Sequence, residues 1–149
     1  MDSAAFRITS SLMKKGMFDP HFVGKFRGRG EWRDSAGGKG GYQVEHEILP
    51  TESGLTIRYT HIFDNDDPDV TASLELSEIA PCIYTVALGG NPVGHGYFLA
   101  GLLHFSIQAG DVQVETGCRS SEAGLSVWGS SNRNAAGNFI AWQENLTRG

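Results

Sequence analysis

The sequence predicts an all-β fold, a single antiparallel up-and-down β-barrel of about 8–10 strands with a short N-terminal helix. Glycine accounts for 20 of the 149 residues, about twice its usual share, and glycine disfavours long helices. Apolar and polar residues alternate over many short segments, with the period of half-buried strands. Most connections are short, which favours a meander, and closing a meander into a barrel removes its exposed edges.

One short helix is predicted before the first strand. Its apolar stripe consists of Phe6, Ile8, Leu12 and Met13. Gly16 is a suitable stop after two lysines. No βαβ unit, repeat or interdomain linker follows, so residues 1–149 are expected to form one domain.

The strands are predicted from a two-residue period that starts after Pro20. In the first strand one face holds Phe22, Gly24, Phe26, Gly28, Gly30 and Trp32, and the other holds Lys25, Arg27, Arg29, Glu31 and Arg33. The apolar face is expected to point inward, where its glycines allow the bending that a closing sheet needs. Further strands are predicted over 42–48, 55–63, 70–79, 82–88, 95–107, 111–118, 125–130 and 138–145.

The composition excludes several classes of protein. With 12 basic and 17 acidic side chains the net charge is −5, so a basic nucleic-acid module is a poor fit. The longest apolar stretch, 97–103, has about a third of the roughly 20 residues that a membrane helix needs. The N-terminal lysines follow the apolar residues, whereas those of a secretory signal precede them. We therefore expect a cytoplasmic protein without nucleic-acid or membrane partners.

Cofactor and metal motifs are absent from the sequence. Cys82 and Cys118 are far apart and lack zinc-ligand spacing, so they are expected to be reduced thiols. His46-Glu47 begins the HExxH zinc motif, but Pro50 replaces its second histidine. We expect no cofactor and no metal. The alternative is a metal site across strands, made of His46, His61 and either His95 or His104.

Gly30-Glu31-Trp32 lies on the first strand and follows a short helix. This tripeptide resembles the G-x-W signature of the calycin barrels, which include lipocalins, fatty-acid-binding proteins and avidins. The resemblance covers the architecture of nearly the whole chain, and it implies that Trp32 closes the barrel floor and that the helix in 1–16 plugs the same end. The last strand lacks the Arg-x-Tyr pair with which fatty-acid-binding proteins hold a carboxylate, which argues against fatty-acid binding.

Polar aromatic side chains are expected inside this barrel. If Trp32 points inward, the alternation on the next two strands turns tyrosines and histidines inward as well. A buried hydroxyl or imidazole without a partner costs about 1–3 kcal/mol, so such groups bond one another, hold water or face a ligand. His95 and Tyr97 lie on the same face of a later strand, and they could join these tyrosines and histidines across the barrel interior. The candidate ligand-binding residues are Trp32, Tyr42, His46, Tyr59, His61, His95 and Tyr97.

These residues leave three functions open. The first is the binding of a small, largely apolar molecule in the barrel interior. The second is a barrel enzyme, namely an isomerase, cyclase, decarboxylase or hydrolase, with His46 or His61 as general base and a tyrosine as proton donor. The third is an interaction protein with a packed interior. We favour the first, because no catalytic motif accompanies the inward imidazoles.

The order of the turns predicts where a ligand enters. Alternate connections, 34–41, 64–69, 89–94 and 119–124, should surround the mouth, and Trp128 with the turn 130–134 should lie at the opposite end. Apolar residues on both faces of the middle strands would allow a homodimer. They are Leu74, Leu76, Ile79, Ile83, Val86 and Leu88.

Overall fold

Ten antiparallel strands close into one barrel in the computed structural model, which describes residues 20–132 and 138–149. The strands are β1 (Gly24–Asp34), β2 (Lys39–Pro50), β3 (Gly54–Phe63), β4 (Val70–Ala80), β5 (Ile83–Leu88), β6 (Asn91–Leu99), β7 (Leu102–Ala109), β8 (Val112–Ser120), β9 (Gly124–Asn132) and β10 (Phe139–Arg148). The 3₁₀ helix η1 (Pro20–Phe22) precedes them. This described part of the chain has no helix long and apolar enough to cross a membrane. The all-β barrel is confirmed, and the helix predicted within 1–16 lies outside the described residues.

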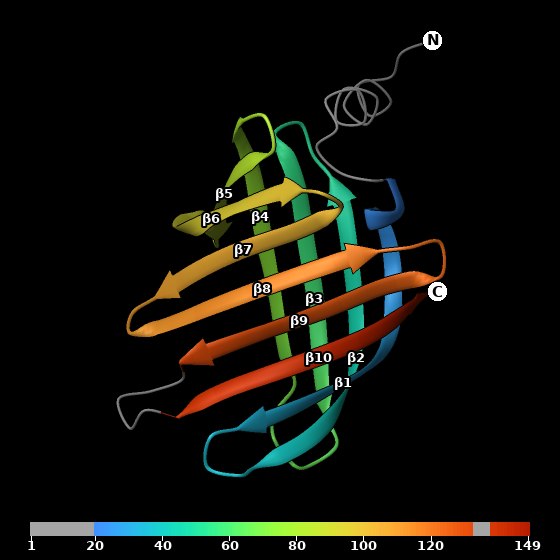
Figure 1. Cartoon of the computed structure of the whole chain (residues 1–149), viewed down its shortest axis with the longest axis vertical. Coiled ribbons are helices and arrows are strands. Elements are labelled where there is room, and N and C mark those ends of the chain that lie inside the picture. The colour runs from blue at the N-terminus through green and yellow to red at the C-terminus, as the bar shows by residue number, and fades with distance from the viewer. Residues whose placement is uncertain (1–19, 133–137) are drawn as a thin grey trace.

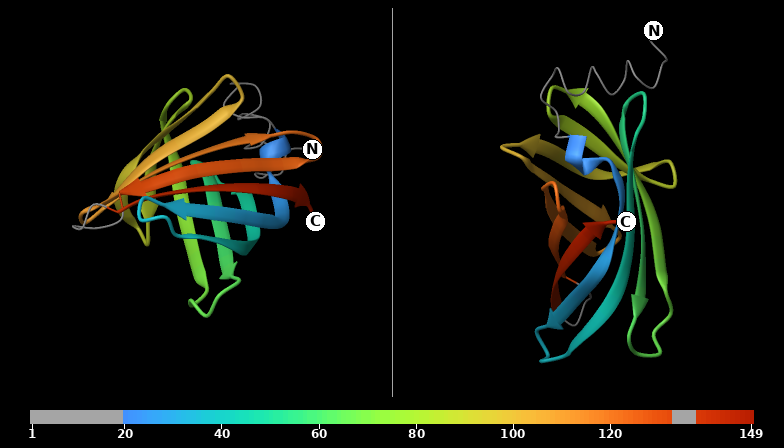
Figure 2. Two further views of the ribbon diagram at one scale, coloured as in Figure 1. Left: turned by 60° about the horizontal axis from the view of Figure 1, so that its bottom comes forward. Right: turned by 90° about the vertical axis from the view of Figure 1, so that its right-hand side faces the viewer.

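The strands follow one another around the barrel in chain order. Each pairs with its neighbours in sequence, and β1 closes the ring by pairing with β10. Strands β7–β10 run across in front of β2–β4 (Figure 1), and Figure 2 shows the two layers from other sides. Because β1 pairs along its length with both β2 and β10, it joins the two layers.

The interior is filled at the end of the barrel that holds η1. Phe22 is fully buried there and packs edge to face against Phe98, with ring centroids 5.3 Å apart. The other buried side chains of this end are Phe26, Ile48, Leu55, Leu76, Tyr84, Leu103, Leu125 and Leu146. They alternate with outward residues along each strand, as the period of two predicts. We call this the closed end.

Solvent reaches the inner wall at the opposite end. Val70 and Leu88 face inward by their register with His61 and Leu74, yet they are 45% and 39% exposed. Phe63, also inward, is half-buried. The described turns of this end are 35–38, 64–69, 89–90 and 110–111. We call it the open end.

The structure divides the predicted strand 95–107 into β6 and β7. Ala100 and Gly101, with φ of 53° and 76°, form the two-residue turn between them. Such turns need positive φ at both positions, which Asn, Asp and Gly supply more often than alanine, so the apolar run 97–103 does not reveal the turn. One additional turn shifts each later turn to the other end of the barrel. The connection 119–124 therefore lies at the closed end, and β9 ends at the open end, both contrary to the prediction.

The apolar residues of the middle strands do not form one surface. Leu74, Leu76 and Val86 are buried inside the barrel and cannot contact a second subunit. Ile79 and Ile83 point outward and are 59% and 37% exposed. A homodimer through this outer surface remains a proposal.

The β6–β7 turn can be tested by exchanging its two residues separately. We expect Gly101→Ala to lower the free energy of unfolding by about 1 kcal/mol, because a side chain disfavours positive φ. Ala100→Gly removes such a side chain and is expected not to destabilise the protein. Urea unfolding of both variants measures this difference, and equal losses in the two would contradict the turn geometry.

Candidate functional site

Three aromatic rings lie flat against the inner wall, each over a glycine of the neighbouring strand. Trp32 lies over Gly40, Tyr42 over Gly30 and Trp142 over Gly129, and each pair is directly opposite in the register. A Cβ on these glycines would come within 2.6, 2.2 and 2.4 Å of the respective rings. Each ring therefore uses the space that a side chain on the next strand would fill, as in the aromatic rescue of strand glycines. Because the rings lie along the wall, they do not project across the barrel.

Gly30 also brings together two polar residues from strands that do not touch. It lies on β1, directly opposite Tyr42 of β2 on one side and Glu144 of β10 on the other. The Tyr42 hydroxyl crosses over Gly30 and donates a hydrogen bond of 2.7 Å to Glu144 Oε2. A Cβ at Gly30 would occupy the position of the Tyr42 ring, so this bond depends on the glycine.

His61 of β3 reaches the same carboxylate oxygen. Its Nε2 lies 3.2 Å from Glu144 Oε2, and its ring centroid is 4.7 Å from those of both Tyr42 and Tyr59. Glu144 is only 2% exposed, whereas the His61 side chain is 18% exposed. The Glu144 carboxylate is thus the most deeply buried group of the cluster, and His61 is the member that solvent reaches. We call Tyr42, Tyr59, His61 and Glu144 the interior cluster.

Sequence reasoning missed Glu144, the centre of this cluster. The run Gln143-Glu144-Asn145 is polar throughout and indicates no inward face. A signal was present, because Trp142 and Leu146 share the parity of Glu144 and both point inward. Of the predicted site residues, Tyr42, His46, Tyr59 and His61 do lie together on the inner face.

Burial keeps the two phenols of the cluster protonated. It raises the pKa of Tyr42 well above its ordinary value, and the Glu144 carboxylate and its hydrogen bond raise that pKa further. Burial also raises the pKa of Tyr59, with a smaller contribution from Glu144. Both hydroxyls are therefore neutral hydrogen-bonding groups at neutral pH.

His46 and Cys118 are neutral groups beside this cluster. Burial lowers the pKa of His46 to about 4, its Nδ1 has no partner among the described residues, and its ring stacks on Tyr59 with centroids 6.1 Å apart. Burial raises the pKa of the Cys118 thiol to about 12, so the thiolate is not available at neutral pH. Neither residue is suited to acid–base or nucleophilic work near pH 7.

His95 and Tyr97 do not face the interior, so that prediction is wrong. On β6 it is Gly96 and Phe98 that are buried, because the inner face takes the large apolar ring. Tyr97 stacks on the outer face against His104 of β7, with centroids 5.2 Å apart. The alternative metal site of His46 and His61 with His95 or His104 therefore cannot assemble, and residues 20–132 and 138–149 hold no group of three metal-binding side chains.

Trp32 does not close the barrel floor as the calycin resemblance implied. It lies at the open end of β1, about 30 Å along the strand from η1, where it pairs with Trp142. Phe22 and Phe26 fill the closed end instead. Trp32 is half-buried and belongs to the wall of the solvent-accessible half of the barrel.

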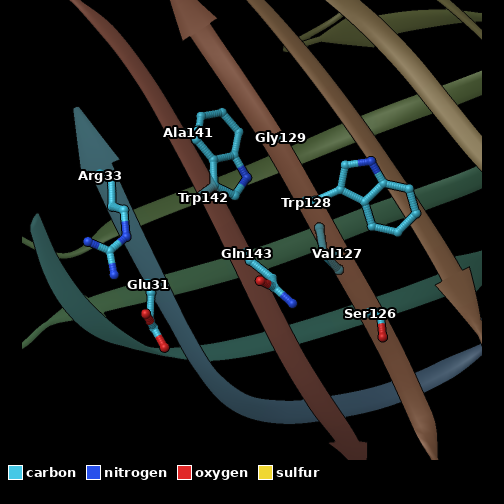
Figure 3. Close-up of a pocket in the computed structure, with 9 residues that line it drawn as sticks. All are labelled: Glu31, Arg33, Ser126, Val127, Trp128, Gly129, Ala141, Trp142 and Gln143. Atoms are coloured by element: carbon cyan, nitrogen blue, oxygen red, sulfur yellow. The ribbon is translucent and has the colours of Figure 1, made fainter. Parts of the chain in front are cut away.

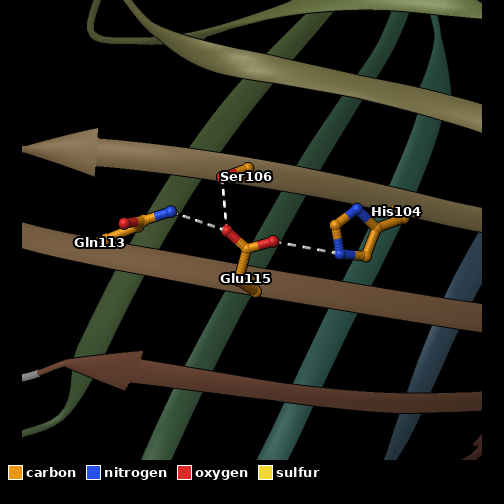
Figure 4. Close-up of polar contacts among 4 residues, drawn as sticks. All are labelled: His104, Ser106, Gln113 and Glu115. Carbon is orange, nitrogen blue, oxygen red and sulfur yellow. Dashed lines mark hydrogen bonds and ion pairs between the residues drawn. The ribbon is translucent and has the colours of Figure 1, made fainter.

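The outer surface carries a polar network around Glu115 (Figure 4). Glu115 Oε2 accepts hydrogen bonds from Ser106 Oγ at 2.5 Å and Gln113 Nε2 at 3.1 Å, and its Oε1 lies 3.4 Å from His104 Nε2. The bond from Ser106 lowers the pKa of the exposed Glu115 carboxyl. The Ser106 proton points to the carboxylate and not to the imidazole, so these residues do not form a nucleophile–base pair.

A shallow outer pocket of about 540 Å³ crosses β1, β10 and β9 (Figure 3). Trp128 lines it, is 40% exposed and lies over Gly117 of β8. Glu31 and Gln143 also line this pocket. This pocket is separate from the interior cluster, because none of the cluster residues lines it and most of its lining residues, such as Trp128 and Gln143, have the outward parity of their strands.

Comparison with known proteins supports the fold and gives no family. No protein-family model and no curated protein sequence matches the chain. The solved structure of the S-type phycobiliprotein lyase CPES from Guillardia theta is similar, with a TM-score of 0.68 and 9% identity over 95% of this chain and 92% of that chain. Rv2717c from M. tuberculosis is also similar, with a TM-score of 0.62 and 14% identity over 89% of this chain and 99% of that chain. The likeness is one of fold, and a closed antiparallel barrel is consistent with the calycin resemblance.

The dependence of the interior cluster on Gly30 can be measured. We expect Gly30→Ala to destabilise the protein by about 1–3 kcal/mol, because the added methyl group displaces the Tyr42 ring. Tyr42→Phe removes the same hydrogen bond but leaves the ring. The double variant should lose less than the sum of the two single losses, as measured by urea unfolding. Strict additivity would show that Gly30 does not position Tyr42.

The buried His46 should make stability depend on pH. Its folded-state pKa of about 4 lies below the ordinary 6.5, so between these values the unfolded chain binds the proton and the folded chain does not. The folded state therefore loses up to about 3 kcal/mol as the pH falls from 6.5 to 4. His46→Leu should lack this part of the loss, as measured by urea unfolding at several pH values. Parallel pH profiles for the two proteins would contradict a neutral, buried His46.

Proposed function

We propose that the barrel binds a small, largely apolar molecule through its open end, with the polar part of the molecule against the interior cluster. The observation that carries this proposal is Glu144, a buried carboxylate held by Tyr42 and His61 at the border of the half of the interior that solvent reaches. Ligand sites are typically apolar hollows with a few fixed polar groups. Trp32, Trp142 and Phe63 would provide the apolar wall.

The polar end of such a ligand would be oriented by His61 and Tyr59. His61 is the exposed member of the cluster, and Tyr59 beside it is half-buried. Glu144, 3.2 Å from the imidazole, and the Tyr42 ring beside it would hold His61 in place from behind. The packed-barrel alternative is disfavoured by the exposure of the inward Val70 and Leu88.

A second candidate function is acid–base catalysis by His61. The His61–Glu144 contact of 3.2 Å is the carboxylate–imidazole arrangement that orients a catalytic base. Of the two histidines considered from the sequence, His46 is the weaker candidate because its pKa of about 4 makes it a poor base at neutral pH. The similar structure named as a phycobiliprotein lyase indicates that a barrel of this shape can belong to an enzyme.

Ligand binding can be tested by filling the open end. Ala72 points inward opposite Tyr59, and Ser73 beside it points outward. An apolar compound present at about a hundred times its dissociation constant should raise the melting temperature of the wild type by about 5–10 °C. Ala72→Trp should abolish this shift because the indole fills the site.

Ser73→Trp is the matched control, and it should keep the ligand-induced shift. The screen uses thermal melting of the full chain with a library of apolar compounds, followed by native mass spectrometry of the hits. The proposal fails if no compound stabilises the wild type, or if the inward and outward tryptophan variants respond alike.

A further inference from the structure

We infer that the interior site selects an organic cation, an amine or amidine carried on an aromatic or apolar body. The inference rests on the proposed function and gives the ligand a charge. It follows from the charges inside the barrel, the aromatic wall and the residues around the open end.

The interior cluster contains a carboxylate that pairs with an imidazole, His61, and with no lysine or arginine of the described residues. Glu144 is the buried carboxylate between the two ends, and its contacts with Tyr42 and His61 both involve Oε2. These two contacts leave Oε1 out. Among lysines and arginines, the inner face of the described strands carries Arg148, which lies at the closed end over the Phe26 ring and donates to the Val23 carbonyl. A ligand carboxylate would therefore meet the negative charge of Glu144 with no lysine or arginine nearby to bind it, whereas an ammonium would be attracted to Glu144.

The wall around this carboxylate is aromatic. Trp32 and Trp142 lie flat over their glycines, so each has one ring face toward the wall and the other toward the interior. Tyr59 lies deeper, between His46 and His61. Cations are attracted to the faces of aromatic rings, most strongly to tryptophan and when the cation is partly desolvated. Aromatic faces together with a buried carboxylate favour a cation over a neutral molecule of the same shape.

The turns of the open end carry a further excess of negative charge. The acidic residues of these turns and of the adjoining end of β1 are Asp34, Asp64, Asp66, Asp67, Asp69 and Asp111. The basic residues at this end of the described chain are Arg33 and Lys39, while Arg29 reaches up to pair with Asp64. A mouth with an excess of one sign of charge raises the local concentration of ligands of the opposite sign. An incoming cation is attracted first at the mouth and then by Glu144.

Three compounds that share an indole and a two-carbon arm test the sign of the charge. Tryptamine is cationic, tryptophol is neutral and indole-3-propionate is anionic at pH 7. We expect tryptamine to bind about tenfold more tightly than tryptophol, and indole-3-propionate to bind most weakly. Dissociation constants are measured on the full chain by ¹⁵N–¹H NMR titration, with perturbations expected at the indole N–H groups of Trp32 and Trp142 and not at that of Trp128.

Glu144→Gln should abolish the preference for tryptamine over tryptophol. Glu45→Gln removes a carboxylate from the exposed outer face of β2 and should keep the preference. If Glu144→Gln fails to fold, the order of the three compounds on the wild type still decides the question. Binding without a preference for the cation overturns this inference and leaves the proposed function standing. Absence of binding by all three compounds and by the apolar library overturns the proposed function itself.

Discussion

The interior of this barrel is organised by the missing side chain at Gly30. Tyr42 and Glu144 lie on strands that are separated by β1, a distance of about 10 Å across the sheet. The phenol bridges it only because nothing projects from β1 at the crossing point. The same device, an aromatic ring over a directly opposite glycine, holds Trp32 and Trp142 against the wall. Glycine is abundant here because it leaves room for rings, in addition to allowing the strands to bend.

The buried carboxylate is costly for stability, and this makes it informative about function. Moving a carboxylate out of water costs several kcal/mol, and the Tyr42 hydrogen bond and the His61 contact offset part of that cost. An apolar side chain at position 144 would fill the space without the penalty. His46 adds a buried nitrogen without a partner among the described residues. Unfavourable polar groups that gather at the border of the accessible half of a barrel are characteristic of a binding or catalytic site.

The two ends of the barrel differ because the apolar side chains are distributed unevenly along the strands. Large aliphatic and aromatic groups collect toward η1, and their contacts fill that end. Toward the other end the inward residues are rings that lie on the wall and aliphatic groups that solvent reaches. Stability and ligand access can therefore reside in different halves of one continuous sheet, with Glu144 and His46 between them.

The sequence by itself determined the barrel and the inward direction of Tyr42, His46, Tyr59 and His61, because alternation with a period of two is a local property of each strand. Only the tertiary structure decided which groups meet. Glu144 reaches Tyr42 through the closure of β1 on β10, a contact between residues 102 positions apart that no local pattern encodes. The turn at Ala100 and Gly101 lay within an apolar run, and it decided which later turns lie at each end. On β6 the inner face takes Phe98, and because side chains alternate along a strand, His95 and Tyr97 face outward.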